Sequence, residues 1–117
     1  MAYTKKAQVF GRPKNQRKAL MSALARSLIL EERISTTEAK AKSLRPIIER
    51  LVTHAKKNTL ASRRLIKSTI DDSEVIKKMV ESIGPRYATR AGGYTRVIKR
   101  TMRGNNDARK LAYIAFV

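Results

Sequence analysis

The chain has 117 residues, the length of one domain, and its 27 lysines and arginines outnumber 9 acidic residues to give a net charge of +18. It has no cysteine, which excludes disulfides, thiol nucleophiles and cysteine-based zinc sites, and no apolar run long enough to span a membrane. So much positive charge on a small chain favours a polyanionic partner, and nucleic acid is the first candidate.

The positive charge is concentrated in two segments that contain no acid. Residues 1–30 hold seven basic residues and residues 85–106 hold six, whereas residues 31–84 hold twelve basic residues and eight of the nine acids. A surface that served only solubility would not need this division. We therefore expect the two outer segments to face the anionic partner.

Gly11 and Pro13 predict an irregular, basic arm over residues 1–13. The arm lacks the apolar stretch of a signal peptide, so the mature chain is expected to begin at or near Met1. From Lys14 to Glu32 the spacing predicts an amphipathic helix. Its apolar face is expected to hold Leu20, Met21, Ala23, Leu24 and Leu28, and its opposite face Lys18, Ser22 and Arg26.

A β-prone stretch at Arg33–Thr36 predicts a short strand before a second helix that ends near Lys57. Ser35-Thr36-Thr37-Glu38 is a capping-box pattern, with a hydroxyl for an unpaired N–H and a glutamate three positions on. Pro46 is expected to kink or restart this helix, because proline lacks an N–H donor. The apolar stripe of the helix consists of Leu44, Ile47, Ile48, Leu51, Val52 and Ala55.

Two further helices are expected at residues 60–68 and 72–83. Acidic residues at 71, 72 and 74 suit the N-terminus of the second of these helices, and Gly84-Pro85 predicts its end. Its buried side is expected to hold Val75, Ile76, Met79, Val80 and Ile83. Residues 95–101 and 108–117 read as strands of a hairpin around a turn at 102–107.

This order of elements predicts an α+β fold. It consists of a helix, a short strand, three helices and a C-terminal β-hairpin, with the helices packed on one face of a small sheet. Residues 1–13 are expected to form the basic arm and residues 14–117 a single domain.

The sequence offers no constellation for catalysis or metal binding. His54 is the only histidine, and a satisfied histidine at the surface or near a helix C-terminus is favoured over a metal ligand. The acids Asp71, Asp72 and Glu74 are better explained as a helix cap than as a metal site. There is no phosphate loop of the G-x-x-x-x-G-K type. We therefore expect no enzymatic activity, no metal and no cofactor.

The segment "GPRYATRAGGYTRV" (84–97) contains three arginines, two tyrosines, a glycine pair and no acid. Arginine can grip a phosphate with two N–H groups or stack on a base. Gly92 and Gly93 would let backbone N–H groups approach an anion closely. Tyr87 and Tyr94 would either stack on an unpaired base or pack on a helix, and both interpretations remain open.

Four stretches resemble the bacterial large-subunit ribosomal protein seventeen family, in the same order and at the family's length. They are "FGRPKNQRKAL" (10–20), "ISTTEAKAKSLRP" (34–46), "GPRYATRAGGYTR" (84–96) and "NDARKLAYIAFV" (106–117). The resemblance implies a three-stranded mixed sheet and a cytoplasmic, non-catalytic, structural protein that is a monomer within the ribosome. It also implies binding to large-subunit rRNA near the mouth of the nascent-peptide exit tunnel, beside other large-subunit proteins, with no membrane and no small-molecule substrate.

The resemblance also implies which residues face the rRNA. In the first basic stretch these are Arg12, Lys14, Arg17 and Lys18, and in the later one Arg86, Arg90, Gly92, Gly93, Tyr94 and Arg96. Charge and chemistry add Lys5, Lys6, Tyr87 and Arg100 to the expected rRNA-binding set.

The chain departs from the family pattern at Gln16, where the family commonly has histidine before Arg17, and at Ala115, where an acid is common. It also ends at Val117 without an extension. Three alternatives share part of the reasoning: a free-standing DNA-compacting protein, a protein that lies on membrane surfaces, and an enzyme that acts on RNA.

Overall fold

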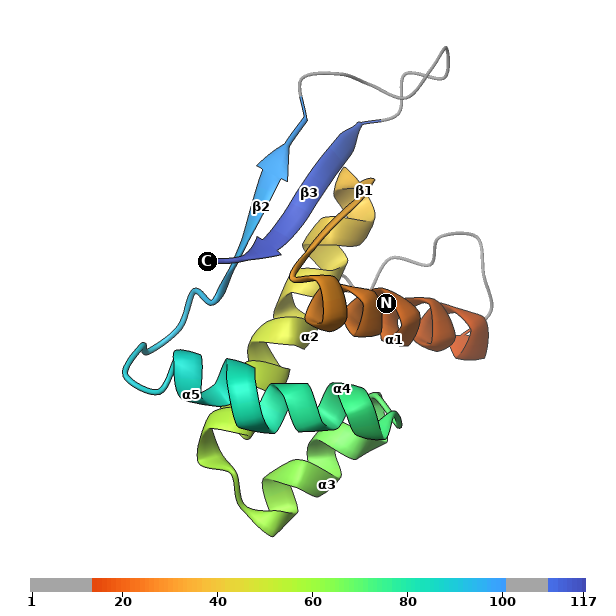
Figure 1. The fold of residues 1–117 in the computed structure, drawn as a ribbon. Helices are drawn as coiled ribbons and strands as arrows, with labels where there is room; N and C mark the ends of the chain where they lie inside the picture. The colour runs from red at the N-terminus through yellow and green to blue at the C-terminus, as the bar shows by residue number, and fades with distance from the viewer. Residues whose placement is uncertain (1–13, 101–109) are drawn as a thin grey trace, which may run out of the picture.

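A computed structural model describes residues 14–100 and 110–117 of the chain (Figure 1). The elements follow the expected order, with a helical segment of three parts before the last two strands. They are α1 (Lys14–Glu31), β1 (Arg33–Thr37), α2 (Glu38–Lys57), α3 (Leu60–Thr69), α4 (Ser73–Lys78), the π-helical turn η1 (Met79–Ile83), α5 (Gly84–Arg86), β2 (Thr95–Lys99) and β3 (Leu111–Phe116).

The three strands form one antiparallel sheet in the order β1-β3-β2. The pairing of β2 with β3 confirms the two strands of the expected hairpin, while its turn at 102–107 lies outside the described residues. The expected mixed sheet is wrong. The last strand lies in the centre and runs against both neighbours, so β1 and β2 share a direction without being paired.

Helix α2 contributes many of the buried core residues, and it packs on one face of the sheet (Figure 1). Strand residues that face it include Ile34, Ile114 and Val97, which lie side by side in register. The predicted stripe of α2 is buried, apart from the half-buried Ile47. Pro46 neither ends nor restarts the helix, which is continuous from Glu38 to Lys57.

The residue that caps the N-terminus of α2 differs from the one in the predicted capping box. Ser35 lies within β1, and the cap is Thr37, whose hydroxyl oxygen accepts a hydrogen bond from the N–H of Lys40 at 3.3 Å. The strand runs as far as Thr37, which is paired with Leu111 of β3. Long-range pairing thus moves the start of the helix by two residues beyond the local pattern.

The buried face of α1 is also rotated from the predicted one. Ala25, Leu28 and Ile29 are its buried residues, whereas Ala23 is exposed. Ser22, expected on the outer face, donates a hydrogen bond to the backbone oxygen of Thr69 at the end of α3. The α1 helix therefore packs against neighbours on more than one side, which its four-residue leucine spacing did not indicate.

The helical segment does not end at Gly84-Pro85 as predicted, because it continues through the π-helical turn η1 into α5. A Cβ atom on Gly84 would lie 2.9 Å from the carbonyl oxygen of Ala55 in α2. Glycine at this position therefore serves the close approach of two helical segments rather than termination. The cap predicted at the start of α4 is confirmed, because Asp72 accepts hydrogen bonds from the N–H groups of Glu74 and Val75.

Candidate nucleic-acid interface

The loop between α5 and β2 is fastened to the body of the protein by its two tyrosines. Tyr87 and Tyr94 are 4% and 3% exposed, and their ring centroids lie 5.3 Å apart. The hydroxyl of Tyr87 donates to the backbone oxygen of Val117 at 2.6 Å. Buried rings present no free face to an unpaired base, so the structure supports packing as the role of both residues.

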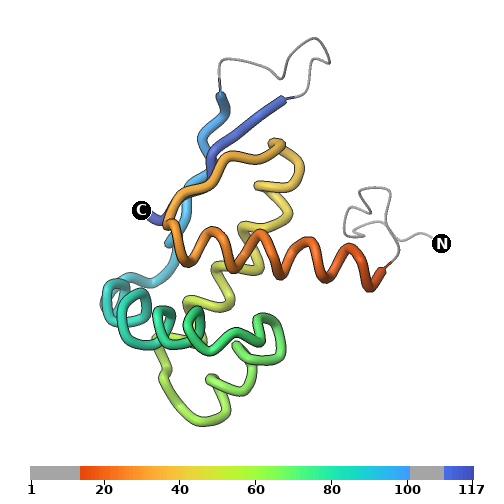
Figure 2. The backbone as a smooth tube through the Cα atoms, turned by 45° about the vertical axis from the view of Figure 1, so that its right-hand side comes forward, coloured from red at the N-terminus to blue at the C-terminus, as the bar shows by residue number. Residues whose placement is uncertain are grey.

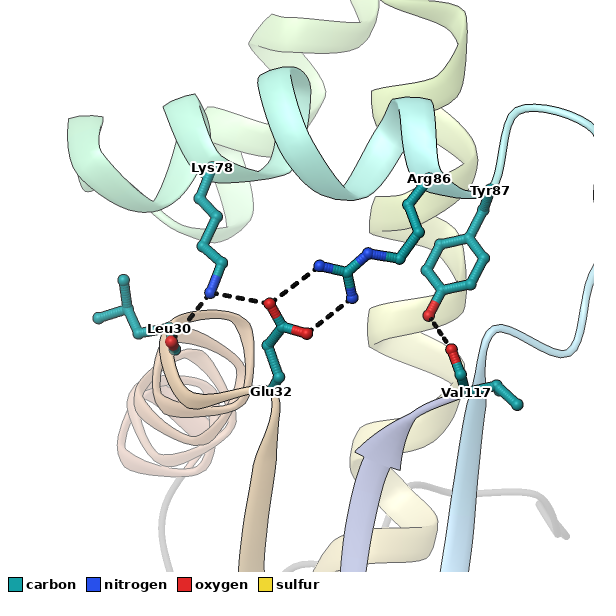
Figure 3. A network of polar contacts seen from close by, with 6 residues as sticks. All are labelled: Leu30, Glu32, Lys78, Arg86, Tyr87 and Val117. Atoms are coloured by element: carbon teal, nitrogen blue, oxygen red, sulfur yellow. Dashed lines mark hydrogen bonds and ion pairs between the residues drawn. The ribbon is translucent and has the colours of Figure 1, made fainter.

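Arg86 is held by an internal ion pair (Figure 3). Its guanidinium donates two hydrogen bonds to the carboxylate of Glu32, at 2.7 and 2.9 Å, and Lys78 Nζ lies 3.2 Å from the same carboxylate. Hydrogen bonding to Arg86, followed by the contact with Lys78, lowers the pKa of Glu32 to about 2, although partial burial acts the other way. Arg86 thus has an acidic partner within the chain, although the segment around it in the sequence contains no acid.

A carboxylate on α2 fixes the end of the loop. Glu49 accepts hydrogen bonds from the N–H groups of Tyr94 and Thr95, at 3.2 and 2.9 Å, and from the Thr95 hydroxyl at 2.8 Å. Lys56, also on α2, donates to the Tyr94 hydroxyl and to the backbone oxygen of Arg90. These two α2 side chains set the path along which the chain enters β2.

Between these anchors, the tip of the loop is open. Arg90 is exposed, and its Nε donates to the carbonyl oxygen of Gly92 at 3.1 Å. Gly93 has a φ of +65°, which favours glycine, whereas a Cβ on Gly92 would meet nothing within 4 Å. The open space beside Gly92 leaves room for a ligand next to this backbone, as the phosphate-binding interpretation of the glycine pair requires.

A second basic region surrounds a groove between α1, α2 and α3. The groove has a volume of about 470 Å³, and no acid is found among the described residues that line it. Its cationic side chains are Lys14, Arg17, Lys18 and Arg50, with His54 beside them, and its apolar wall includes Met21, Ile47, Leu51 and Leu65. Arg17 and Arg50 come from different helices, so α2 adds to a basic surface that sequence alone assigned to α1.

The two basic regions are far apart. The start of α1 and the loop after α5 lie on opposite sides of the molecule in both Figure 1 and Figure 2. Arg96 and Arg100 belong to neither region, because they lie on or just after β2 and turn to the face of the sheet away from α2. Lys5, Lys6 and Arg12 lie outside the described residues.

Within the described residues, no group of three potential metal ligands occurs. His54 is in the last turn of α2 as expected, and its Nδ1 is buried with no hydrogen-bond partner among the described residues. Helices long and apolar enough to cross a bilayer are likewise absent from residues 14–100 and 110–117.

Sequence reasoning missed the residues that shape both regions. Glu49, Lys56 and Arg50 all belong to α2, where their spacing indicates only an exposed, charged helix face. Their roles depend on what packs beside that face, and no local signal in the sequence could have identified them.

The chain is similar to known proteins over nearly its whole length. The family described as ribosomal protein L17 matches residues 20–117. The large ribosomal subunit protein bL17 of Hydrogenobaculum sp. is 50% identical over all of this chain and 99% of its own length. The proteins of the same name from Thermodesulfovibrio yellowstonii and Fusobacterium nucleatum are 50% and 44% identical, over 92% and 100% of this chain and 80% and 100% of their own lengths.

Proposed function

Because this chain belongs to the ribosomal protein L17 family of the large ribosomal subunit, we propose that it is a structural component of that subunit in the cytoplasm and binds its rRNA. The observation that carries the proposal is the combination of family membership with two basic regions on opposite sides of one small domain. A protein so built can neutralise two stretches of packed RNA at once and hold them at a fixed spacing.

The first proposed contact is the basic rim of the groove. Lys14, Arg17 and Lys18 on α1 and Arg50 on α2 surround an apolar wall. Charged side chains around such a wall suit phosphates on the rim with a sugar or base edge below. The contact needs no rearrangement, because Lys14, Lys18 and Arg50 are already exposed.

The second proposed contact is the tip of the loop, with Arg90, Gly92 and Gly93. Arg86, Tyr87 and Tyr94, which the sequence suggested as further RNA contacts, are assigned to the support of this loop instead. The guanidinium of Arg86 is hydrogen-bonded to the carboxylate of Glu32, and the rings of Tyr87 and Tyr94 are buried. Support of this kind limits the entropy that the loop loses when RNA binds.

The finer parts of the proposal follow from the family resemblance. We place the protein near the mouth of the nascent-peptide exit tunnel, as a monomer beside other large-subunit proteins, without a catalytic role. A free-standing DNA-compacting protein is the main alternative. Sedimentation of a cell lysate through a sucrose gradient separates the two, since the ribosomal protein travels with large subunits and the alternative travels with chromosomal DNA.

Footprinting on large-subunit rRNA tests the two contacts themselves. We expect two protected RNA segments. Replacing Arg17 and Lys18 together by alanine should remove one segment, and replacing Arg90 should weaken the other. Protection that both variants lose to the same extent, or a single protected segment, would contradict the proposal of two separate contacts.

A further inference from the structure

The sheet has a second face that α2 does not cover. Side chains alternate along each strand, so residues beside the buried Ile34, Val97 and Ile114 point the other way. Two rows cross the three strands on this open face. One is Arg33, Ala115 and Arg96, and the next is Ser35, Tyr113 and Ile98. Arg33, Ser35, Arg96 and Ile98 are exposed, which shows that no described helix covers them.

An aromatic ring flanked by two guanidinium groups stands at the centre of this face. The Cζ of Arg33 lies 4.1 Å from the ring centroid of Tyr113, and the Cζ of Arg100 lies 5.3 Å from it. Arg100 is also held by a hydrogen bond to the hydroxyl of Ser35 at 3.1 Å. The three side chains therefore form one cluster of contacting groups.

The charge on this face is of one sign. Its described residues include Arg33, Arg96 and Arg100, and none of those on β1, β2 and β3 that point this way is acidic. The acids that border the sheet are paired with other cations: Glu32 with Arg86 and Lys78, and Glu38 with Lys42 and Lys99. A surface that gathers arginine around a half-buried tyrosine without an acid matches an anionic, ring-containing polymer.

We propose that this open face is a binding platform for single-stranded RNA, in which unpaired bases stack on the Arg33–Tyr113–Arg100 cluster and Arg96 holds a neighbouring phosphate. Duplex RNA is excluded from this mode because its bases are already stacked on one another. The inference rests on the proposed function for the identity of the polymer, and it adds stacking of unpaired bases to the two contacts proposed above.

A tryptophan in place of Tyr113 gives a direct measurement, because the chain contains no other tryptophan. In the full chain with Tyr113→Trp, a short single-stranded oligouridylate should quench the indole fluorescence, and a duplex RNA of equal length should not. Leu60→Trp is the matched control. Leu60 is 66% exposed at the start of α3, away from the sheet, so its fluorescence should stay constant.

Affinity measurements give an independent test on the same oligouridylate. Tyr113→Phe keeps the ring and should bind like the parent chain, whereas Tyr113→Leu should bind about tenfold more weakly. Arg33→Lys keeps the charge but removes the planar group, so it should also weaken binding. Denaturation curves identify any variant whose loss of binding merely reflects loss of folding.

The outcomes separate this inference from the proposed function. Equal binding by Tyr113→Phe and Tyr113→Leu, or no quenching at position 113, would overturn the platform. Binding of large-subunit rRNA that still depends on Arg17 and Arg90 would then leave the proposed function standing. A fluorescence change at position 113 that requires other large-subunit proteins and not RNA would also overturn it, in favour of a protein contact.

Discussion

Arg86 and Glu32 are 54 positions apart in the chain, yet the guanidinium of one donates two hydrogen bonds to the carboxylate of the other. The pair ties the end of α5 to the junction between α1 and β1 (Figure 3). Lys78, which also donates to the backbone oxygen of Leu30, joins the same carboxylate. Arg86, which the sequence analysis expected to bind RNA, thus connects two distant segments of the fold.

The first prediction is that Arg86 contributes to stability more than to RNA affinity. Arg86→Ala should lower the free energy of unfolding by about 1 kcal/mol, at the upper end for a pair this exposed, because the contact is bidentate. Chemical denaturation measures the loss. Filter binding of the folded variant to large-subunit rRNA should be nearly unchanged, and a large loss of affinity without a loss of stability would contradict the assignment.

The second prediction concerns acid. The pKa of Glu32 is about 2 in the folded protein against an ordinary value of 4.5, so the unfolded chain takes up a proton that the folded chain refuses. The stabilisation is complete above about pH 5 and is lost as the pH falls towards 2. Denaturation of the parent chain and of Glu32→Gln over this range should give curves that converge at low pH. A constant difference would show that the charge of Glu32 is not responsible.

The third prediction separates the two glycines. Gly93→Ala should cost about 1 kcal/mol of stability, because alanine resists the positive φ found there. Gly92→Ala should leave stability nearly unchanged, since nothing lies within 4 Å of the added methyl group. If RNA packs against this backbone, Gly92→Ala should still reduce rRNA affinity. Unchanged affinity in both folded variants would limit the glycine pair to a turn.

The fourth prediction uses salt. With thirteen basic residues in the two acid-free segments and about half of them engaged, log–log plots of rRNA affinity against salt should have a slope of magnitude about 4 to 8. Arg90→Ala should reduce that magnitude by about 1, because it removes one phosphate contact. Arg86→Ala serves as the control and should keep the slope of the parent chain. A slope near zero would rule out binding led by phosphates.

The fifth prediction addresses the anchor of the loop. Glu49→Ala leaves two backbone N–H groups and the Thr95 hydroxyl without their acceptor, which should cost about 2 kcal/mol. Glu49→Gln retains one acceptor oxygen and should cost less. Hydrogen exchange should show faster exchange at Tyr94 and Thr95 in the alanine variant. Protection equal to that of the parent chain would mean that the strand pairing alone holds this segment.

Local patterns in the sequence were sufficient for the elements whose signals are local. The apolar stripe of α2 repeats with the helical period over twenty residues, and it is buried nearly as predicted. Asp72 caps α4 because its side chain needs only the N–H groups of the next residues. The apolar residues of β3 predicted a strand for the same reason, although of these only Ala112 and Ile114 are buried. Family motifs of a dozen residues identified the family, since their order along the chain can be read without a fold.

Only the tertiary structure decided which side chains are available to a partner. Tyr87 and Tyr94 are buried and Arg86 is paired because their partners lie 30 to 54 positions away in the chain. These partners are Glu32 between α1 and β1, Glu49 on α2 and Val117 after β3. The sheet is antiparallel because β3 enters between two strands that are distant in sequence. Tyr113 lies on an open face because side chains alternate between the two faces of a strand, and α2 packs on only one face of the sheet. Sequence spacing fixes which residues share a face, but what lies against that face depends on contacts between distant segments.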